Sequence, residues 1–327
     1  MNEVRWGILS TGKIARAFAE ALRDTPGAVL AAVGSRTPEG AQAFCAEFGG
    51  TPYGSYEELA AAPGVDAIYI GTPHPMHASN AMLALNGGKA VLCEKAFTMN
   101  RREAEQVVAL ARSRKLFLME AMWTRFLPAI EEAKRLIDAG EIGTVRQVVA
   151  DFGFAAKVGP EHRLINAELG GGALLDLGIY PLSIAAYLLG PVASVSAQAV
   201  MQPNGVDAQT AFTLKHANGT LSICSASMLA RTPVELVVSG ERGFVRVNSR
   251  FHRATSVTID CEGASPRTIE APYLGNGYVH EIVEVHRCLA AGLLESPRMT
   301  HSESVALMGV MDDIRAQIGL RYAADDA

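Results

Sequence analysis

Two patterns of apolar residues divide the chain into an N-terminal third and a longer remainder. In the first third, short apolar runs alternate with stretches whose apolar residues recur at helical spacing. The runs, which predict buried strands, cover residues 4–9, 29–34, 66–71, 90–93 and 116–119. The stretches between them predict helices, several of which begin at the cap signatures Thr37-Pro38, Ser55-x-x-Glu58 and Asn100-x-x-Glu103. This alternation predicts a parallel, doubly wound sheet.

From about residue 144, strands follow one another with turns rather than helices between them. The predicted strands cover residues 144–154, 192–201, 209–215, 220–228 and 234–247, and the predicted helices cover residues 178–189, 279–291 and 302–319. A hairpin turn at residues 216–219 joins two of the strands, and such connections predict a large open, mostly antiparallel sheet. The fold class is therefore α/β, with a doubly wound parallel domain at residues 1–121 and an α+β domain at residues 122–327.

Composition and charge narrow the class of protein. The 327 residues are 49% hydrophobic and 19% charged, with a formal net charge of −5, which argues against nucleic acid as the main partner. We find no apolar run of the roughly 18 residues that a membrane span needs, and Met1-Asn2-Glu3 leads into the first strand without a signal peptide. The five scattered cysteines are typical of free thiols in a reducing cytoplasm.

The first predicted strand-to-helix turn has the sequence Ser10-Thr11-Gly12-Lys13-Ile14-Ala15, an altered G-x-G-x-x-G pattern. Gly12 keeps the position at which the backbone of such a turn approaches a pyrophosphate, and Ala15 is small enough for helix–strand packing. The pattern alone does not decide the matter. Its place directly after the first strand favours a dinucleotide site.

The second predicted strand ends in Gly34-Ser35-Arg36-Thr37, where NAD-dependent enzymes usually place a carboxylate that binds the ribose 2′-hydroxyl. A carboxylate would repel a 2′-phosphate, whereas Arg36 offers it a bidentate donor beside the hydroxyls of Ser35 and Thr37. The alternative is that Arg36 is an ordinary solvated arginine. We favour NADP over NAD as the cofactor.

Two further stretches carry candidate chemistry. Strand 90–93 ends at Glu94 and Lys95, at the sheet edge where open α/β sheets bind ligands, although lysine is also common at strand ends for solubility. Asp176 and Tyr180 lie four residues apart after three glycines, and can face one side of a helical turn. A tyrosine phenol can exchange a proton near neutral pH if a cation such as Lys95 stabilises its anion. The spacing alone equally suits a helix N-cap and a core tyrosine.

The histidines predict no metal site. His74 and His77 flank a Pro-rich turn after strand 66–71, and a second His/Glu group lies on the predicted helix 279–291. Neither group has the H-E-x-x-H spacing of a zinc site. Because the turn lies at the carboxyl edge of the sheet, we expect His74 and His77 near the nicotinamide half of the cofactor.

Three stretches resemble the Gfo/Idh/MocA family of NAD(P)-dependent oxidoreductases, namely residues 71–77, 88–95 and 171–180. The resemblance spans nearly the whole chain. Within the family it is closest to the branch of the dimeric dihydrodiol dehydrogenases and NADP-dependent D-xylose 1-dehydrogenases, through residues 5–8, 53–59 and 116–126.

The resemblance implies a Rossmann domain, a second domain whose open sheet often forms a dimer interface, and a last helix (302–319) that packs back on the Rossmann domain. It implies Lys95 and Tyr180 as the catalytic pair, with Asp176 lining the site. The usual Glu-Lys-Pro reads Glu94-Lys95-Ala96 here, which removes a stiffening proline. The expected cofactor-binding residues are Ser10, Thr11, Gly12, Lys13, Ile14, Ser35, Arg36, Thr37, Thr72, Pro73, His74, His77, Glu94, Lys95, Trp123 and Arg125. The expected substrate-binding residues are Phe154, Arg163, Asp176 and Tyr180.

We therefore expect a cytoplasmic, NADP-dependent oxidoreductase that transfers hydride between the nicotinamide and the CH–OH of a sugar, polyol or cyclic diol, working as a homodimer or higher homo-oligomer. An NADPH-dependent reductase of a dicarbonyl or anhydro-ketose is the alternative within the same class. A non-catalytic NADP or sugar sensor is the alternative from a different class. The presence of Lys95, Asp176 and Tyr180 together favours the enzyme.

Overall fold

The computed structural model describes residues 3–326, which divide into two compact units. The first unit runs to Trp123 and also includes Leu274–Met308, and the second comprises Thr124–Tyr273 and continues from Gly309. The first unit thus holds a helical segment outside the residues 1–121 that the sequence assigned to the Rossmann domain. Helix α9 (His301–Ile318) begins in the first unit and ends in the second.

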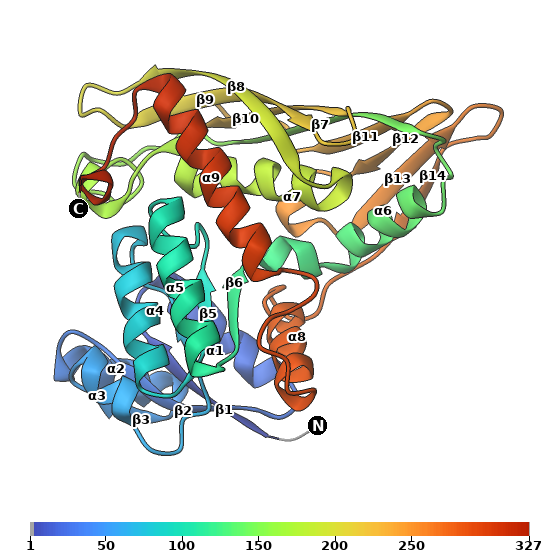
Figure 1. Ribbon diagram of the computed structural model, residues 1–327. Coiled ribbons are helices and arrows are strands. Elements are labelled where there is room, and N and C mark those ends of the chain that lie inside the picture. The colour runs from blue at the N-terminus through green and yellow to red at the C-terminus, as the bar shows by residue number, and fades with distance from the viewer. Residues whose placement is uncertain (1–2, 327) are drawn as a thin grey trace. The chain divides into compact units, whose positions relative to one another are not determined.

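The first unit contains one parallel sheet of six strands in the order β3-β2-β1-β4-β5-β6 (Figure 1). Its strands are β1 (Val4–Leu9), β2 (Ala28–Gly34), β3 (Thr51–Tyr53), β4 (Ala67–Ile70), β5 (Ala90–Glu94) and β6 (Leu118–Ala121). Its complete helices are α1 (Lys13–Asp24), α2 (Pro38–Phe48), α3 (Tyr56–Ala61), α4 (His77–Asn86), α5 (Arg101–Arg114) and α8 (Val279–Ala290). This strand order is that of dinucleotide-binding folds, so the predicted doubly wound parallel sheet is confirmed.

Side-chain caps fix where the helices of this unit begin. The side-chain oxygens of Thr37, Ser55 and Asn100 each accept a hydrogen bond from the backbone N–H three residues later, at 3.2, 3.1 and 2.9 Å. Each cap satisfies a donor that the first helical turn leaves without an intrahelical partner. The three helix starts predicted from sequence are confirmed.

Helix α8 completes the core of the first unit. It packs against α1, and Trp6, which is fully buried, donates a hydrogen bond from Nε1 to His286 Nε2 at 3.0 Å. On the same side Phe18 stacks on Tyr69 with ring centroids 3.7 Å apart. His286 lies 280 residues after Trp6, so a distant segment of the chain supplies part of the interior beside the Rossmann sheet.

The second unit contains an eight-stranded sheet in the order β14-β13-β12-β11-β7-β10-β9-β8. Its strands are β7 (Val145–Gly153), β8 (Val192–Met201), β9 (Asp207–His216), β10 (Leu221–Ser227), β11 (Leu236–Gly240), β12 (Gly243–Val247), β13 (Ser256–Cys261) and β14 (Arg267–Glu270). Its complete helices are α6 (Pro128–Asp138) and α7 (Ile179–Leu189). Within the described part of this sheet only β7 and β10 pair in parallel, so the predicted mostly antiparallel sheet is confirmed.

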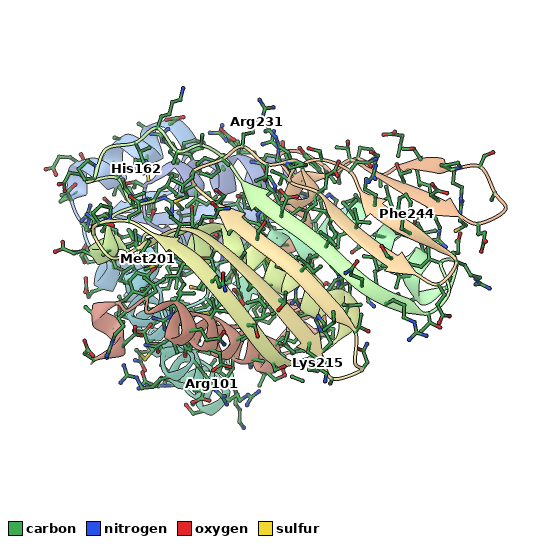
Figure 2. The ribbon with its side chains drawn as sticks, turned by 90° about the horizontal axis from the view of Figure 1, so that it is seen from above. Arg101, His162, Met201, Lys215, Arg231 and Phe244 are labelled. Atoms are coloured by element: carbon green, nitrogen blue, oxygen red, sulfur yellow. The ribbon has the colours of Figure 1, made fainter. Side chains whose placement is uncertain are left out.

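The two faces of this sheet differ. Helix α7 packs against β7 and β10, and α6 packs against β12 and β13. Figure 2 views the other face, over which no helix of the second unit lies in the part of the chain that the structure describes. Val149, Leu221 and Ile223 are 40%, 50% and 45% exposed, and Ile223 is the cross-strand partner of Val149. The open sheet therefore presents an apolar patch.

Three sequence expectations need correction. Residues 234–247 are not one strand, because a turn at Glu241 and Arg242 folds them into the hairpin β11–β12. Helix α7 begins one residue later than predicted and continues a π-helical segment, Leu174–Gly178. The stretch Ala167–Leu189 is long and apolar enough to cross a membrane, contrary to our reading of the sequence, but 83% of its most apolar window is buried within the protein, as in a core helix.

Candidate active site

The turn after β1 keeps a glycine-like backbone although its first residue is serine. Ser10 has a φ of 132°, a region that side chains rarely adopt and that the first glycine of a dinucleotide turn would occupy freely. Its hydroxyl donates to Gly71 O at 2.9 Å and accepts from Gly12 N at 3.2 Å. These two bonds hold the turn shape without the glycine, which explains how an altered motif keeps its geometry.

Helix α1 presents an uncapped N-terminus at this turn. Its N-cap residue is Gly12, which is exposed and has no side chain to accept from the first-turn N–H groups. The first turn, all of it within the described residues, carries no acidic side chain, while Lys13 is exposed. Free N–H groups and the positive end of the helix dipole together suit a pyrophosphate.

The end of β2 carries a cation rather than a carboxylate. Arg36 is exposed, and Ser35 is buried beside it. Thr37 uses its hydroxyl oxygen to cap α2, but the hydroxyl proton remains able to donate. Positive charge at this edge suits a ribose 2′-phosphate, and the assignment of Arg36 to that group stays a prediction.

His77 ties two of the predicted loops together. It is 1% exposed, and its ring nitrogens lie 2.8 Å from Thr72 O and 2.9 Å from Ala96 O. Burial and then the nearby positive charge of Lys95 lower its pKa, which outweighs the two carbonyl contacts. His74 packs edge-on against the same ring, 5.5 Å between centroids. His77 thus joins the Thr72 loop to the turn that carries Lys95.

Two buried acids, Glu94 and Glu281, interact close to Lys95. Glu94 Oε1 accepts from the Tyr69 hydroxyl at 2.6 Å, and Glu94 Oε2 accepts from the backbone N–H of Lys95 at 3.2 Å. Glu281 on α8 is fully buried, and burial together with the charge of Glu94 raises its pKa well above the ordinary value. Lys95 itself is half-buried, and its peptide bond to Ala96 is cis. Tyr69 was missed in the sequence, and Glu281 was noted only within the His/Glu group of helix 279–291; a solvated face for that group is wrong, because Glu281, Glu284 and His286 are buried.

The second unit carries Asp176 inside the π-helical segment Leu174–Gly178, not at a helix N-cap. Asp176 is 5% exposed, and its Oδ1 accepts from Arg163 Nη1 at 3.0 Å. Arg163, half-exposed on the loop that precedes the glycines, is therefore paired with the carboxylate that the sequence placed in the same set. π-helical turns are rare and occur frequently at functional sites.

Tyr180 lies in an aromatic cluster. It is 7% exposed, and its ring meets Phe152 edge-on at 5.1 Å and His252 at 5.8 Å. His252 stacks on Phe152 at 4.3 Å. Sequence reasoning missed His252, because it lies 72 positions from Tyr180 in an unremarkable loop before β13. Tyr180 is neither solvent-exposed nor a purely aliphatic core residue.

Three more of the expected site residues, Trp123, Phe154 and Arg125, lie in three separate environments. Trp123 in the first unit stacks on Tyr278, 4.8 Å between centroids. Phe154 packs on a cluster that includes Leu164 and Leu177. Arg125 is fully buried in the second unit and donates from Nε to Ser183 Oγ at 2.9 Å, so at least part of its guanidinium serves the packing of α7. Its assignment to the cofactor stays a prediction.

Among residues 3–326, no group of three or more His, Cys, Asp or Glu side chains is arranged to hold a metal ion.

Comparison with known proteins places these features in a family. Residues 4–122 match the family described as "Oxidoreductase family, NAD-binding Rossmann fold", and residues 130–246 match "GFO/IDH/MocA C-terminal domain". The chain belongs to the GFO/IDH/MocA oxidoreductase family. The predicted resemblance is confirmed, and the protein is an oxidoreductase whose first unit has an NAD-binding Rossmann fold.

Relatives of similar length are dehydrogenases. The chain is 39% identical to a trans-1,2-dihydrobenzene-1,2-diol dehydrogenase of Danio rerio, with 98% of this chain and 99% of that protein aligned. It is 35% identical to a D-xylose 1-dehydrogenase (NADP(+)) of Hypocrea jecorina, with 98% and 93% aligned.

Two solved structures are similar to this chain over nearly its whole length. An aldose-aldose oxidoreductase from Caulobacter crescentus, complexed with glycerol, matches with a TM-score of 0.89 and 25% identity over 97% of each chain. A 3-ketoreductase from Actinomadura kijaniata, in complex with NADP and TDP-benzene, matches with a TM-score of 0.86 and 28% identity over 97% of this chain and 98% of the other.

Proposed function

We propose that this protein is an NADP-dependent dehydrogenase of a sugar, polyol or cyclic diol. The observation that carries the proposal is the buried pair of Asp176 and Tyr180 on consecutive turns, with Arg163 at the carboxylate, in a family of oxidoreductases. A carboxylate and a phenol together can bind two neighbouring hydroxyl groups of one substrate. The names of the relatives, which are dehydrogenases of a cyclic diol and of an aldopentose, support this substrate class.

The cofactor proposal rests on the first unit. The uncapped start of α1 at Gly12 would bind the pyrophosphate, and Arg36 with Ser35 and Thr37 would bind the 2′-phosphate. Residues that surround the nicotinamide end would be Thr72, Pro73, His74, His77, Trp123 and Arg125. NADP supplies the hydride acceptor when it is bound. The D-xylose dehydrogenase relative, whose name includes NADP(+), supports this choice.

The proposed mechanism assigns proton transfer to the protein. Tyr180 Oη takes the proton of the reacting hydroxyl while the carbon that bears this hydroxyl loses a hydride. Lys95 Nζ stabilises the phenolate form of Tyr180 and orients the hydroxyl. Asp176, paired with Arg163, holds a neighbouring substrate hydroxyl. Lys95 belongs to the first unit and Tyr180 to the second, so their approach is part of the proposal.

The test follows NADP reduction by absorbance, with NAD in parallel, across aldopentoses, aldohexoses, inositols and cyclic trans-diols. We expect turnover with at least one of them, weak activity with NAD, and a loss of kcat by about 100-fold or more in Tyr180→Phe. Turnover that survives Tyr180→Phe would overturn the mechanism and keep the enzyme. No turnover together with tight NADPH binding would favour a sensor over an enzyme.

A carbonyl reductase is the second candidate, because the superposable structure from Actinomadura kijaniata is a 3-ketoreductase. The same residues would then act in reverse, with Tyr180 donating its proton to the new alkoxide. NADPH oxidation with dicarbonyls and anhydro-ketoses distinguishes the two directions.

Homodimerisation and a cytoplasmic location complete the proposal. The exposed patch of Val149, Leu221 and Ile223 on the uncovered sheet face would be buried by a second copy of the chain. Light scattering of the wild type and of Ile223→Asp tests this, with dissociation expected in the variant. The cysteines of the described chain are all free, as suits a reducing compartment.

A further inference from the structure

The C-terminal tail contacts the glycine turn that precedes the Asp176 segment. Tyr322 is 5% exposed, and its hydroxyl donates to Gly171 O at 2.6 Å. A Cβ added to Gly172 would lie 3.0 Å from the same hydroxyl and 2.4 Å from Asp207 Oδ1. Gly172 also has a φ of 129°, so both space and backbone conformation demand glycine there. The tail, the glycine turn and Asp207 thus meet closely within the second unit.

Asp207 holds the next part of the same segment. This residue at the start of β9 is fully buried, and its Oδ2 accepts from the backbone N–H of Leu174 at 2.8 Å and from the Thr210 hydroxyl at 2.5 Å. Leu174 is the first residue of the π-helical segment. One turn on, the backbone N–H of Asp176 donates to Gly172 O at 3.3 Å. The register of Asp176 therefore depends on Gly171 and Gly172, which Tyr322 and Asp207 fix.

The tail is itself anchored to the last helix. Arg315 is 4% exposed, its guanidinium donates to Asp312 at 2.5 Å and to Asp325 at 2.6 Å, and it lies 5.5 Å from the centre of the Tyr322 ring. Asp325 also accepts from the backbone N–H of Tyr322 at 2.9 Å. A buried arginine between two carboxylates and an aromatic ring orders a chain end that would otherwise fray.

We propose that Tyr322 is a positioning residue, which with Asp207 sets the orientation of the Asp176–Tyr180 turn toward substrate. The expected effect of Tyr322 on catalysis rests on the proposed function, whereas its role in holding the turn rests only on the contacts described above. π-helical turns tend to relax to α-helix or loop unless their surroundings hold them, and here the holding groups lie on β9 and at the end of the chain. Tyr322 touches no reacting atom in this account and acts only through Gly171.

The test compares Tyr322→Phe, which keeps the ring under Arg315 and removes only the hydroxyl, with Arg321→Ala. Arg321 is the neighbouring tail residue and pairs with Asp326 at the surface, so its variant perturbs the tail without touching the glycine turn. The first readout is hydrogen exchange of the amides of Leu174 and Asp176, which needs no activity. We expect faster exchange at these amides in Tyr322→Phe, by up to about tenfold, with wild-type exchange in Arg321→Ala.

The second readout is kinetic. We expect Tyr322→Phe to lower kcat by about three- to tenfold at an unchanged KM for NADP, because the residues proposed to bind the pyrophosphate and the 2′-phosphate lie in the first unit. Unchanged exchange would overturn the proposal, as would faster exchange throughout the second unit. Faster exchange at Leu174 and Asp176 with wild-type kcat would overturn the positioning role. If the wild type turns over none of the substrates, the proposed function fails, while the exchange result still decides whether Tyr322 holds the turn.

Discussion

Glu281 is a buried acid whose removal should change how stability depends on pH. It is fully buried on α8, and neither carboxylate oxygen has a hydrogen-bond partner among residues 3–326. Burial, and secondly the charge of Glu94, raises its pKa well above the ordinary value of 4.5. Folded protein therefore holds this proton at a pH at which unfolded protein has lost it. The free energy of unfolding then falls as pH rises above about 4.5, until the folded-state pKa is reached.

The magnitude follows from one proton. A single linked proton changes the free energy of unfolding by at most about 1.4 kcal/mol per pH unit. Glu281→Gln removes this dependence on pH. The difference in free energy of unfolding between the variant and the wild type should therefore shift in favour of the variant by up to about 2.7 kcal/mol between pH 5.5 and 7.5. At pH 4.5 the two proteins should differ little in stability, because the folded protein holds the Glu281 proton and half of the unfolded chains still carry it.

Glu284 provides a matched control three residues along the same helix. It is 3% exposed; burial alone would raise its pKa, but hydrogen bonds from Arg287 and Ser296 hold it below the ordinary value. Its contribution to stability is therefore present above the unfolded pKa and is lost as pH falls through the lower folded pKa. Glu284→Gln should lose stability at pH 7.5, and lose less at acid pH.

Urea unfolding at half-unit steps from pH 4.5 to 8 measures all three proteins. If Glu281 is protonated in the folded protein, the free energies of unfolding of wild type and Glu281→Gln diverge as pH rises. Parallel curves would show that Glu281 is ionised in the folded protein, and a curve diverging toward acid pH would reverse the sign.

Three further predictions concern the proposed ligand sites. Arg36→Ala should weaken NADP binding by about tenfold and leave NAD binding unchanged, because an exposed charge-assisted pair to the 2′-phosphate is lost; fluorescence titration of both reduced dinucleotides measures this, and equal losses would remove Arg36 from the 2′ site. Ser10→Ala should destabilise the protein by about 1–3 kcal/mol through loss of the two hydroxyl bonds, and Ser10→Gly by less, because glycine accepts the φ of 132°; the reverse order in thermal unfolding would count against strain at Ser10. Arg163→Ala should raise the KM for substrate by about three- to tenfold without changing NADP affinity, because Asp176 loses its ion pair with Arg163; a change confined to NADP affinity would move Arg163 out of the substrate set.

Local signals in the sequence were enough for most elements within residues 1–121, although they missed the short strand β3. The apolar runs located β1, β2, β4 and β5, and the caps at Thr37, Ser55 and Asn100 located the helix starts, because each signal is contained within a few neighbouring residues. The nucleotide turn was also readable, although Ser10 replaces a glycine. Its two hydroxyl bonds show why the substitution is tolerated.

Contacts between distant segments were not readable. The strand predicted at 234–247 contains a tight turn at Glu241 and Arg242. This turn was missed because neither residue is a Gly or Pro that would indicate it. The π-helical segment around Asp176 depends on Asp207 and Tyr322, whose sequence separations from it are 31 and 146 positions. His252, Tyr69 and Glu281 likewise join their neighbours only through the fold.

The discontinuity of the first unit bears on how the protein is made. Strand β6 lies at an edge of the parallel sheet, and there the backbone N–H of Leu118 donates to Leu294 O at 3.0 Å while His301 contacts Leu118 O at 3.0 Å. The hydrogen bond of Trp6 likewise cannot form before His286 has been synthesised. On the ribosome, where the N-terminal end emerges first, the nucleotide-binding unit must remain unfinished while residues 124–273 are synthesised. Translation thus completes this unit only after most of the other has emerged, so ribosome-bound chains ending before residue 274 would expose an open core and a bare strand edge, and would be natural clients of chaperones.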